Sequence, residues 1–149
     1  MNPFELLKAD HKKVADLMDK LEKTTERGIK TREELFGKIQ EELEIHTHIE
    51  ETIFYPFLQK EKETEDITRE AFEEHKVVKT LLAELDSLNK DDEQWLPKFT
   101  VLKENIEHHV EEEEGEMFKE ARKAVDKDDL ERLGDQMNTE KTRMMANVE

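Results

Sequence analysis

The sequence contains no cysteine, and this absence removes several classes of protein from consideration. Without cysteine there is no disulfide framework, no thiolate metal site and no thiol nucleophile. The absence agrees with a reducing compartment, and we expect a cytoplasmic protein. Residues 1–4 also lack the basic and apolar segments of a signal peptide.

Glycine, proline and long apolar runs are also scarce. The chain has four glycines, three prolines and no sustained alternation of apolar and polar residues, which favours helices over strands. No apolar run approaches the roughly 20 residues of a membrane-spanning helix. The 24 basic residues are outnumbered by 40 acidic ones, and the formal net charge is −16. Because such a surface repels nucleic acid and anionic lipid, we expect neither nucleic acid nor a membrane as partner.

Apolar residues recur at spacings of three and four in four long segments, which predicts an all-α protein. The segments are residues 3–23, 31–59, 66–88 and 95–123. Short links between them favour an up-down-up-down antiparallel four-helix bundle over about residues 3–123. A shorter helix over about residues 127–145 is expected to lie across or beside the bundle. We interpret residues 1–149 as a single domain.

Capping residues predict where two of these helices begin. Thr31 is followed three positions later by Glu34, and this pair forms a capping box for the second helix. Asp66 is expected to cap the third helix.

The sequence contains two similar stretches about 63 residues apart, and each places histidine and glutamate inside an apolar helical pattern. The aligned residues are His11 with His75, His46 with His109, Glu50 with Glu113, and Phe54-Tyr55 with Met117-Phe118. A repeat that keeps imidazoles and carboxylates among apolar positions predicts a metal site built twice around a pseudo-twofold axis.

The spacing of these residues explains how one helix can supply two donors to the same site. Positions i and i+4 project from one helix face, as in His46/Glu50 and His109/Glu113. The neighbouring helices add His11 and His75, which makes four imidazoles and two carboxylates. Imidazole suits iron, copper, nickel and zinc, and carboxylates can bridge two ions. Cations would also offset the cost of burying two glutamates, which is several kcal/mol per ion.

Several neighbouring polar residues have a competing assignment. Helix phase places His46 rather than His48, and His109 rather than His108, on the inner face. In the acidic run of residues 111–114, only Glu113 aligns inward. The residues that we assign to the surface are His48, Glu51, His108 and Glu112, with an additional carboxylate for the metal site as the alternative role of Glu51 and Glu112.

Tyr55 is interpreted as a packing residue rather than a metal ligand or radical site. Lys79 is expected to lay its aliphatic stem along its helix, with tuning of a metal ligand as the alternative. Helix phase also predicts a water-excluding cavity beside the site. Its expected lining is Leu7, Ile53, Phe54 and Met117.

At these motifs the sequence resembles the hemerythrin-like (HHE) cation-binding family, over about residues 3–120, and the tail from Asp128 also resembles the family's terminal helix. The matching motifs are Asp10-His11-Lys12-Lys13-Val14, His46-x3-Glu50-Glu51-x3-Tyr55-Pro56, Glu74-His75-Lys76-Val77-Val78 and His109-x3-Glu113-Glu114-x2-Met117-Phe118. The resemblance implies a four-helix bundle that holds a non-haem centre of two iron ions joined by a solvent-derived oxygen. It also implies binding of dioxygen, or chemistry with peroxide or nitric oxide.

By this resemblance, Glu50 and Glu113 would bridge the two irons. The terminal ligands would be the histidines, in two pairs. One pair would be His11 and His46, and the other His75 and His109.

Two departures from the oxygen-carrying members of the family weaken a simple carrier role. Lys79 occupies the position of an additional histidine ligand, and His109 and Glu113 are four rather than five residues apart. An open metal position allows reactivity as well as reversible binding. We therefore expect a dioxygen-binding di-iron protein that serves in oxygen binding, sensing, storage or oxidative stress. The alternatives are an enzyme acting on peroxide or nitric oxide, and an iron-handling or structural bundle that binds zinc or manganese.

Overall fold

A computed structural model of the protein describes residues 1–148, and it contains helices without strands in that range. The α-helices are α1 (Pro3–Glu22), α2 (Ile29–Ile49), α3 (Tyr55–Gln59), α4 (Glu65–Ser87), α5 (Trp95–Glu112), α6 (Phe118–Ala124) and α7 (Lys127–Val148). A 3-10 turn, η1 (Glu26–Gly28), precedes α2, and two π-helical segments, η2 (Glu50–Phe54) and η3 (Glu113–Met117), join α2 to α3 and α5 to α6. None of the helices within residues 1–148 has the length and apolar character needed to cross a bilayer.

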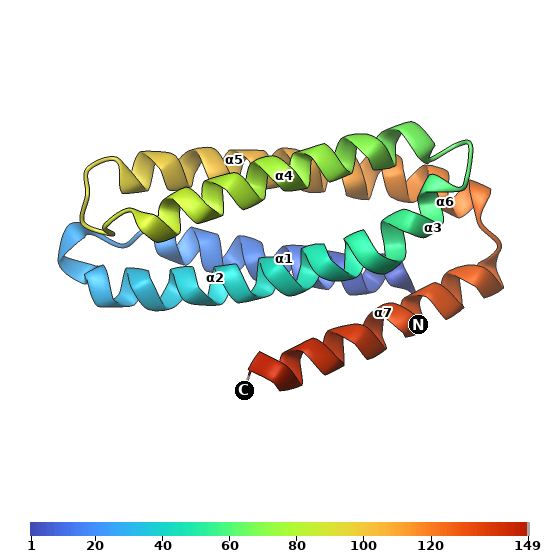
Figure 1. Ribbon diagram of the computed structural model, residues 1–149, viewed down its shortest axis with the longest axis horizontal. Helices are drawn as coiled ribbons and strands as arrows, with labels where there is room; N and C mark the ends of the chain where they lie inside the picture. Colours follow the sequence, from blue (N-terminus) through green and yellow to red (C-terminus); the bar gives the residue numbers. More distant parts are fainter. Residues whose placement is uncertain (149) are drawn as a thin grey trace.

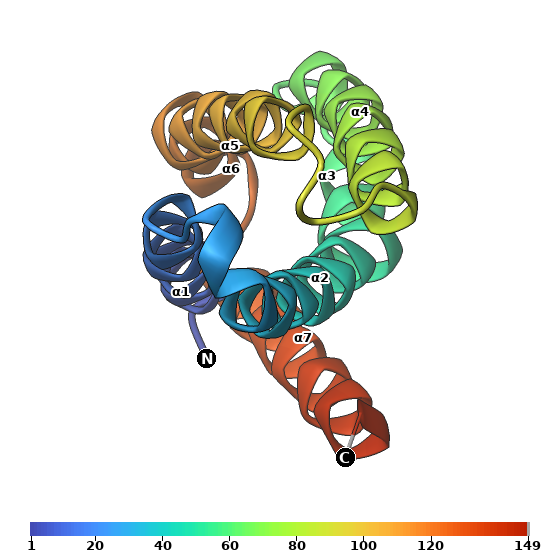
Figure 2. The same ribbon diagram turned by 90° about the vertical axis from the view of Figure 1, so that its left-hand side faces the viewer.

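Four long helical segments run alternately up and down around a common axis (Figures 1 and 2). They are α1, α2 continued by η2 and α3, α4, and α5 continued by η3 and α6. α1 packs against α2 and α4 against α5, while α1 also meets α5 and α3 meets α4. α7 lies outside this ring against α1, α2 and η2. The predicted all-α bundle with an external C-terminal helix is confirmed.

The buried apolar residues form two clusters, one toward each end of the bundle. One is centred on Phe4, Phe54 and Phe118, and the other on Phe36, Trp95 and Phe99. In each of the four long helical segments, a buried histidine lies in the sequence between residues of the first cluster and residues of the second. The fold therefore places the histidines at one level, between two apolar layers.

The two π-helical segments begin at equivalent positions of the repeat. The backbone N–H of Tyr55 bonds to the carbonyl of Glu50, and that of Phe118 bonds to the carbonyl of Glu113. In an α-helix, residues five apart point in directions about 140° apart. A π turn brings residue i+5 back over residue i, and such turns are frequent at functional sites. Each segment therefore lets a buried glutamate and the aromatic residue five positions later face the interior.

The capping prediction for the second helix is wrong. α2 begins at Ile29, so Thr31 lies inside its first turn. The buried Arg32 side chain decides this start, because it donates to both the carbonyl and the hydroxyl of Thr24, at 3.1 and 3.0 Å. It also donates to the carbonyl of Lys90 at 2.6 Å.

The predicted cap of the third helix is also wrong, since α4 begins at Glu65 and Asp66 lies within its first turn. The buried hydroxyl of Thr64 donates to the carbonyl of Leu58 at 2.6 Å and fixes the chain just before the helix.

The C-terminal helix was predicted to be shorter than the bundle helices and to end near residue 145. It extends to Val148, and its 22 residues exceed the 20 of α1. Its first half packs tightly on the start of the chain. A Cβ at Gly134 would come within 1.9 Å of the Met1 carbonyl oxygen, so only glycine permits this approach. Its second half is mostly polar and meets the bundle through ion pairs of Glu140 and Lys141, which apolar periodicity does not reveal.

Candidate metal centre

The structure brings together the six side chains predicted as metal ligands, and all six are buried. Their donor atoms form two groups in which all atoms lie within 4.8 Å of one another. The first group is His11, His46, Glu50 and Glu113, and the second is Glu50, His75 and His109. The pairs of histidines are those expected from the resemblance, and Glu50 belongs to both groups.

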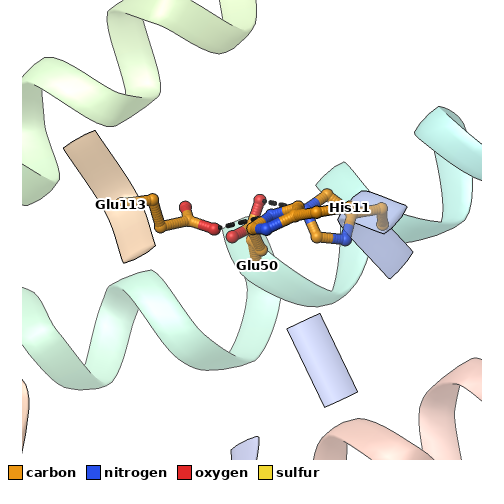
Figure 3. Close-up of side chains that lie close together, drawn as sticks. His11, Glu50 and Glu113 are labelled. Carbon is orange, nitrogen blue, oxygen red and sulfur yellow. Dashed lines mark ion pairs between the residues drawn. The ribbon is translucent and has the colours of Figure 1, made fainter. Parts of the chain in front are cut away.

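Each buried carboxylate lies between one histidine of each pair. Glu50 Oε1 is 3.0 Å from His46 Nε2 and 3.2 Å from His75 Nε2. Glu113 instead uses one oxygen for each histidine. Oε1 is 3.1 Å from Nε2 of His11, and Oε2 is 3.2 Å from Nε2 of His109. Figure 3 shows His11, Glu50 and Glu113 converging from three different helical segments. This is the arrangement that two cations bridged by carboxylates require.

The outer ring nitrogen of each histidine faces a second carboxylate. The Nδ1 contacts are His11 to Glu114 (2.6 Å), His46 to Asp10 (3.0 Å), His75 to Glu51 (2.8 Å) and His109 to Glu74 (2.7 Å). An ionised carboxylate only accepts hydrogen bonds, so each Nδ1 carries the donated proton. In the neutral form that binds a metal, the lone pair of such an imidazole is on Nε2, which is directed at the centre. Carboxylates orient metal-binding histidines in this way in many proteins.

Five buried polar atoms at the centre have no hydrogen-bond partner: His11 Nε2, His46 Nε2, both carboxyl oxygens of Glu50, and Glu113 Oε1. The imidazole Nε2 atoms and the carboxylate oxygens face one another at 3.0–3.2 Å without hydrogen-bond geometry. Burying unpaired polar and charged atoms costs several kcal/mol. A cation bound between them would remove this cost, so the donor set fits a metal ion.

Without a metal ion, the buried carboxylates favour protonated, positively charged histidines. Burial lowers the pKa of His46, but the charge of Glu50 and the hydrogen bond to Asp10 outweigh it and raise this pKa to about 10. Burial acts against protonation of His109 too, yet its bonds to Glu113 and Glu74 raise its pKa to about 11. Metal binding must therefore displace protons from these imidazoles.

Tyr55 contributes to the site, so its interpretation as a packing residue is incomplete. The fully buried ring packs against Phe72, but the hydroxyl donates to Glu113 and lies 3.3 Å from His75 Nε2 and 3.2 Å from His109 Nε2. Burial, followed by the charge of Glu113, raises the pKa of this phenol well above its usual value. The π turn that starts at Glu50 places the hydroxyl here, and α-helical phase does not predict it.

Four carboxylates around the histidines were not predicted as part of the site. The assignment of Glu51 to the surface is wrong, because it is half-buried and accepts from His75 and from Lys79 Nζ at 2.8 Å. Glu114 was assigned to the solvated run but contacts His11. The repeat carried a signal for this role. It aligns Asp10 with Glu74 and Glu51 with Glu114, each next to a predicted ligand.

The other neighbours lie outside the two groups of donors. Lys79 is about half exposed and reaches Glu51 rather than a predicted ligand. His108 is exposed and pairs with Glu112 on its own helix at 3.1 Å, as a surface assignment requires. His48 is half-buried and contacts Glu140 of α7 at 2.8 Å.

A small cavity of about 30 Å³ lies beside the four histidines. Its apolar lining is formed by Val14, Leu43, Val78, Ile106 and Val110. The predicted lining is therefore wrong. The predicted residues Leu7, Phe54 and Met117 belong to the apolar cluster on the other side of the site, where aromatic rings pack tightly, and Ile53 packs against it. Helix phase identifies inward-facing residues, but it does not reveal which layer leaves a space.

Comparisons with known proteins agree with this geometry. The model of the family described as Hemerythrin HHE cation binding domain matches residues 2–121. The chain belongs to this family. A solved structure of a hemerythrin HHE cation-binding domain-containing protein from Mycobacterium kansasii shares 25% identity with a TM-score of 0.86, and the match covers 99% of this chain and 89% of that one.

A curated relative from Nostoc sp., named DNA nickase, is 24% identical over 148 residues. The match covers 99% of this HHE protein but 41% of the relative, so the chain spans less than half of that longer protein. Family membership and the buried His/Glu groups together identify a cation-binding domain with a site suited to metal.

Proposed function

We propose that this HHE protein holds two iron ions and binds a small neutral diatomic molecule, dioxygen or nitric oxide, beside them. The observation that carries the proposal is the set of buried donor atoms without hydrogen-bond partners at the centre of the bundle. Paired iron would supply the reversible electron transfer to a diatomic molecule that the side chains here do not supply.

The two positions would be held by different numbers of protein donors. His11, His46, Glu50 and Glu113 would hold the first ion. The second would be held by three residues, His75, His109 and Glu50, with the Tyr55 hydroxyl next to them. A position with fewer protein ligands is the one that accepts an exogenous molecule.

The cavity beside the histidines supports a small apolar ligand. At about 30 Å³ it has room for a molecule of a few atoms, and its lining exposes almost no polar surface. A charged or strongly hydrated ligand would lose its hydration there without compensation. Leu43, Thr47 and Val78 also line a larger pocket of about 240 Å³ between α2 and α4, which offers a route from solvent.

The proposal is tested by metal analysis and visible spectroscopy of protein purified without added metal. We expect close to two irons per chain, and absorption that changes when the reduced protein meets dioxygen or nitric oxide. His46→Ala should lose bound iron, whereas His108→Ala, which removes an exposed histidine from α5, should retain it. Stoichiometric zinc or manganese instead of iron, or iron-loaded protein without a spectral response, would contradict the proposal.

A second candidate function is disproportionation of hydrogen peroxide to water and dioxygen at the same centre. The Tyr55 hydroxyl favours it, because it places a proton donor between Glu113 and the second pair of histidines. Oxygen release from peroxide by iron-loaded protein, compared with Tyr55→Phe at equal iron content, tests this candidate. Absence of turnover in the wild-type protein excludes it.

A further inference from the structure

A lysine of α7 is connected to the predicted metal ligands through one buried carboxylate. Lys141 Nζ lies 2.5 Å from Asp10 Oδ1, and the other oxygen of Asp10 accepts the Nδ1 proton of His46 at 3.0 Å. The Asp10 side chain is only 4% exposed, and that of Lys141 is 24% exposed. A positive charge on the outermost helix therefore acts on an inner histidine through a single side chain that solvent barely screens.

The equivalent carboxylate of the repeat lacks such a partner. Glu74 accepts the Nδ1 proton of His109 at 2.7 Å, and its other close neighbours are Glu112 and His108 of α5. Within residues 1–148, no lysine or arginine forms an ion pair with Glu74. The two acid–histidine pairs thus differ in their support, because an ammonium group lies behind Asp10, whereas a carboxylate and an imidazole lie behind Glu74.

The lysine behind Asp10 changes how strongly His46 donates electrons to a metal ion. A carboxylate that accepts the Nδ1 proton makes Nε2 a stronger donor, and this effect is greatest when the carboxylate keeps its full charge. An ammonium group on the far oxygen withdraws part of that charge and adds a positive charge near the metal position. Both effects weaken the hold of His46 on a cation.

We propose that Lys141 is a positioning residue of the metal centre, which aligns Asp10 and lowers the donor strength of His46. Docking of α7 then sets the affinity and the redox balance of the first metal position. The family match ends at residue 121, whereas the solved structure from Mycobacterium kansasii covers 99% of this chain, so α7 lies beyond the matched sequence but within the shared fold. The inference rests on the proposed function only in requiring that the six predicted ligands bind metal.

The chain offers a matched control for the loss of a positive charge from α7. Arg143 pairs with Glu140 of the same helix at 2.5 Å, and Glu140 in turn contacts His48 on α2 at 2.8 Å. This second link lies on the same part of α7 but ends on a histidine outside the site. Arg143→Met therefore removes a positive charge from this part of α7 without touching Asp10.

The experiment titrates metal-free protein with Zn²⁺ and compares Lys141→Met, Lys141→Arg and Arg143→Met with the wild type. We expect Lys141→Met to bind Zn²⁺ about fivefold more tightly, because a positive charge near the site is lost. Lys141→Arg restores the charge and should bind like the wild type. Arg143→Met should leave the affinity unchanged.

A redox titration of the iron-loaded proteins supplies the second readout. At a fixed potential, the ratio of reduced to oxidised iron should fall about fivefold in Lys141→Met, because the oxidised ions carry more positive charge. It should stay at the wild-type value in the two other variants.

Unchanged or weaker Zn²⁺ binding by folded Lys141→Met overturns the inference, and so does an equal change in Arg143→Met. These results differ from a failure of the proposed function, in which the wild-type protein itself would bind no metal.

Discussion

The two metal positions have related histidines but different surroundings. At the first, Asp10 supports His46 and is itself paired with Lys141 of α7. At the second, Glu74 supports His109 without a cation. The aromatic residues differ as well, because η2 brings the Tyr55 hydroxyl to the second position, whereas Phe118 follows η3 and packs in the apolar cluster.

This difference teaches that the repeat specifies the ligands and single residues outside the repeat pattern make the two halves unequal. The two positions share their donor types and differ in one hydroxyl and in the carboxylate that a lysine supports, which is the buried Asp10 at the first and the more exposed Glu51 at the second. Unequal positions suit a centre in which one ion is fully held by protein and the other accepts a small molecule. Four predictions test this comparison.

The largest effect is expected from the two bridging glutamates. Glu50 is in both donor groups, so Glu50→Ala should abolish binding of both ions, whereas Glu113→Ala should weaken the first position and leave partial occupancy. Metal content per chain after iron loading measures this, with the exposed Glu111 as the site of a control substitution, Glu111→Ala. Equal losses of bound metal in the Glu50 and Glu113 variants would contradict the prediction that Glu50 alone serves both metal positions.

The next effect is a pH dependence that distinguishes metal-free from metal-loaded protein. The pKa of His46 is raised to about 10 and that of His109 to about 11 in the metal-free site. Their contribution to stability is fully present below the unfolded pKa of about 6.5 and is lost as pH rises through 10 to 11. The Tm of metal-free protein should therefore fall between pH 7 and 11.

Metal-loaded protein should show a flatter pH profile, because a bound cation has already replaced these protons. Loading at pH 8 should also release protons, which a pH indicator in weak buffer detects. A Tm that falls equally in both forms would contradict this assignment of the protons.

A smaller effect is expected from Tyr55 and Phe118, which follow the two π-helical segments and differ in one hydroxyl. Tyr55→Phe should destabilise metal-free protein by about 1–3 kcal/mol, because Glu113 loses a buried donor. With iron bound, the variant should lose any phenolate absorption band. Urea unfolding and visible spectra measure both.

Phe118→Tyr is the reciprocal change. It inserts a hydroxyl into a packed apolar cluster and should destabilise the protein without creating such a band. A phenolate band that persists in Tyr55→Phe would mean that this residue is not its source.

The smallest effect is expected at Lys79, the cation that supports the carboxylate behind His75. Lys79 is 53% exposed, and exposed ion pairs contribute about 0–1 kcal/mol. Lys79→Met should change Zn²⁺ affinity less than Lys141→Met does, because Asp10 is more deeply buried than Glu51. A larger effect at Lys79 would reverse the proposed order of the two lysines.

Sequence predictions succeeded for residues that are close together in the chain and failed for contacts between distant residues. His46 and Glu50 were placed together correctly because both lie on one helix, where a spacing of four always means the same face. His11 was found because it fills a gap in an apolar series. The pairing of Lys141 with Asp10 joins residues 131 positions apart, and no local spacing encodes it.

The first π turn explains one of the remaining errors. Each π turn adds a residue to one helical turn, and neither contains a proline that would indicate a break in the helix. An α-helical projection through the turn therefore assigns the wrong direction to the aromatic residue that ends it. For this reason the Tyr55 hydroxyl was placed in the packing.

Helical periodicity and the internal repeat determined, without any structure, that the protein is all-α and that four histidines and two glutamates face the interior. These properties are local, because each depends only on spacing along one helix or on likeness between two segments. Tertiary structure alone decided which carboxylate supports which histidine, where the cavity lies, and that α7 contacts the centre. Such contacts depend on how separate helices meet and in what register, which burial and charge determine across the whole molecule.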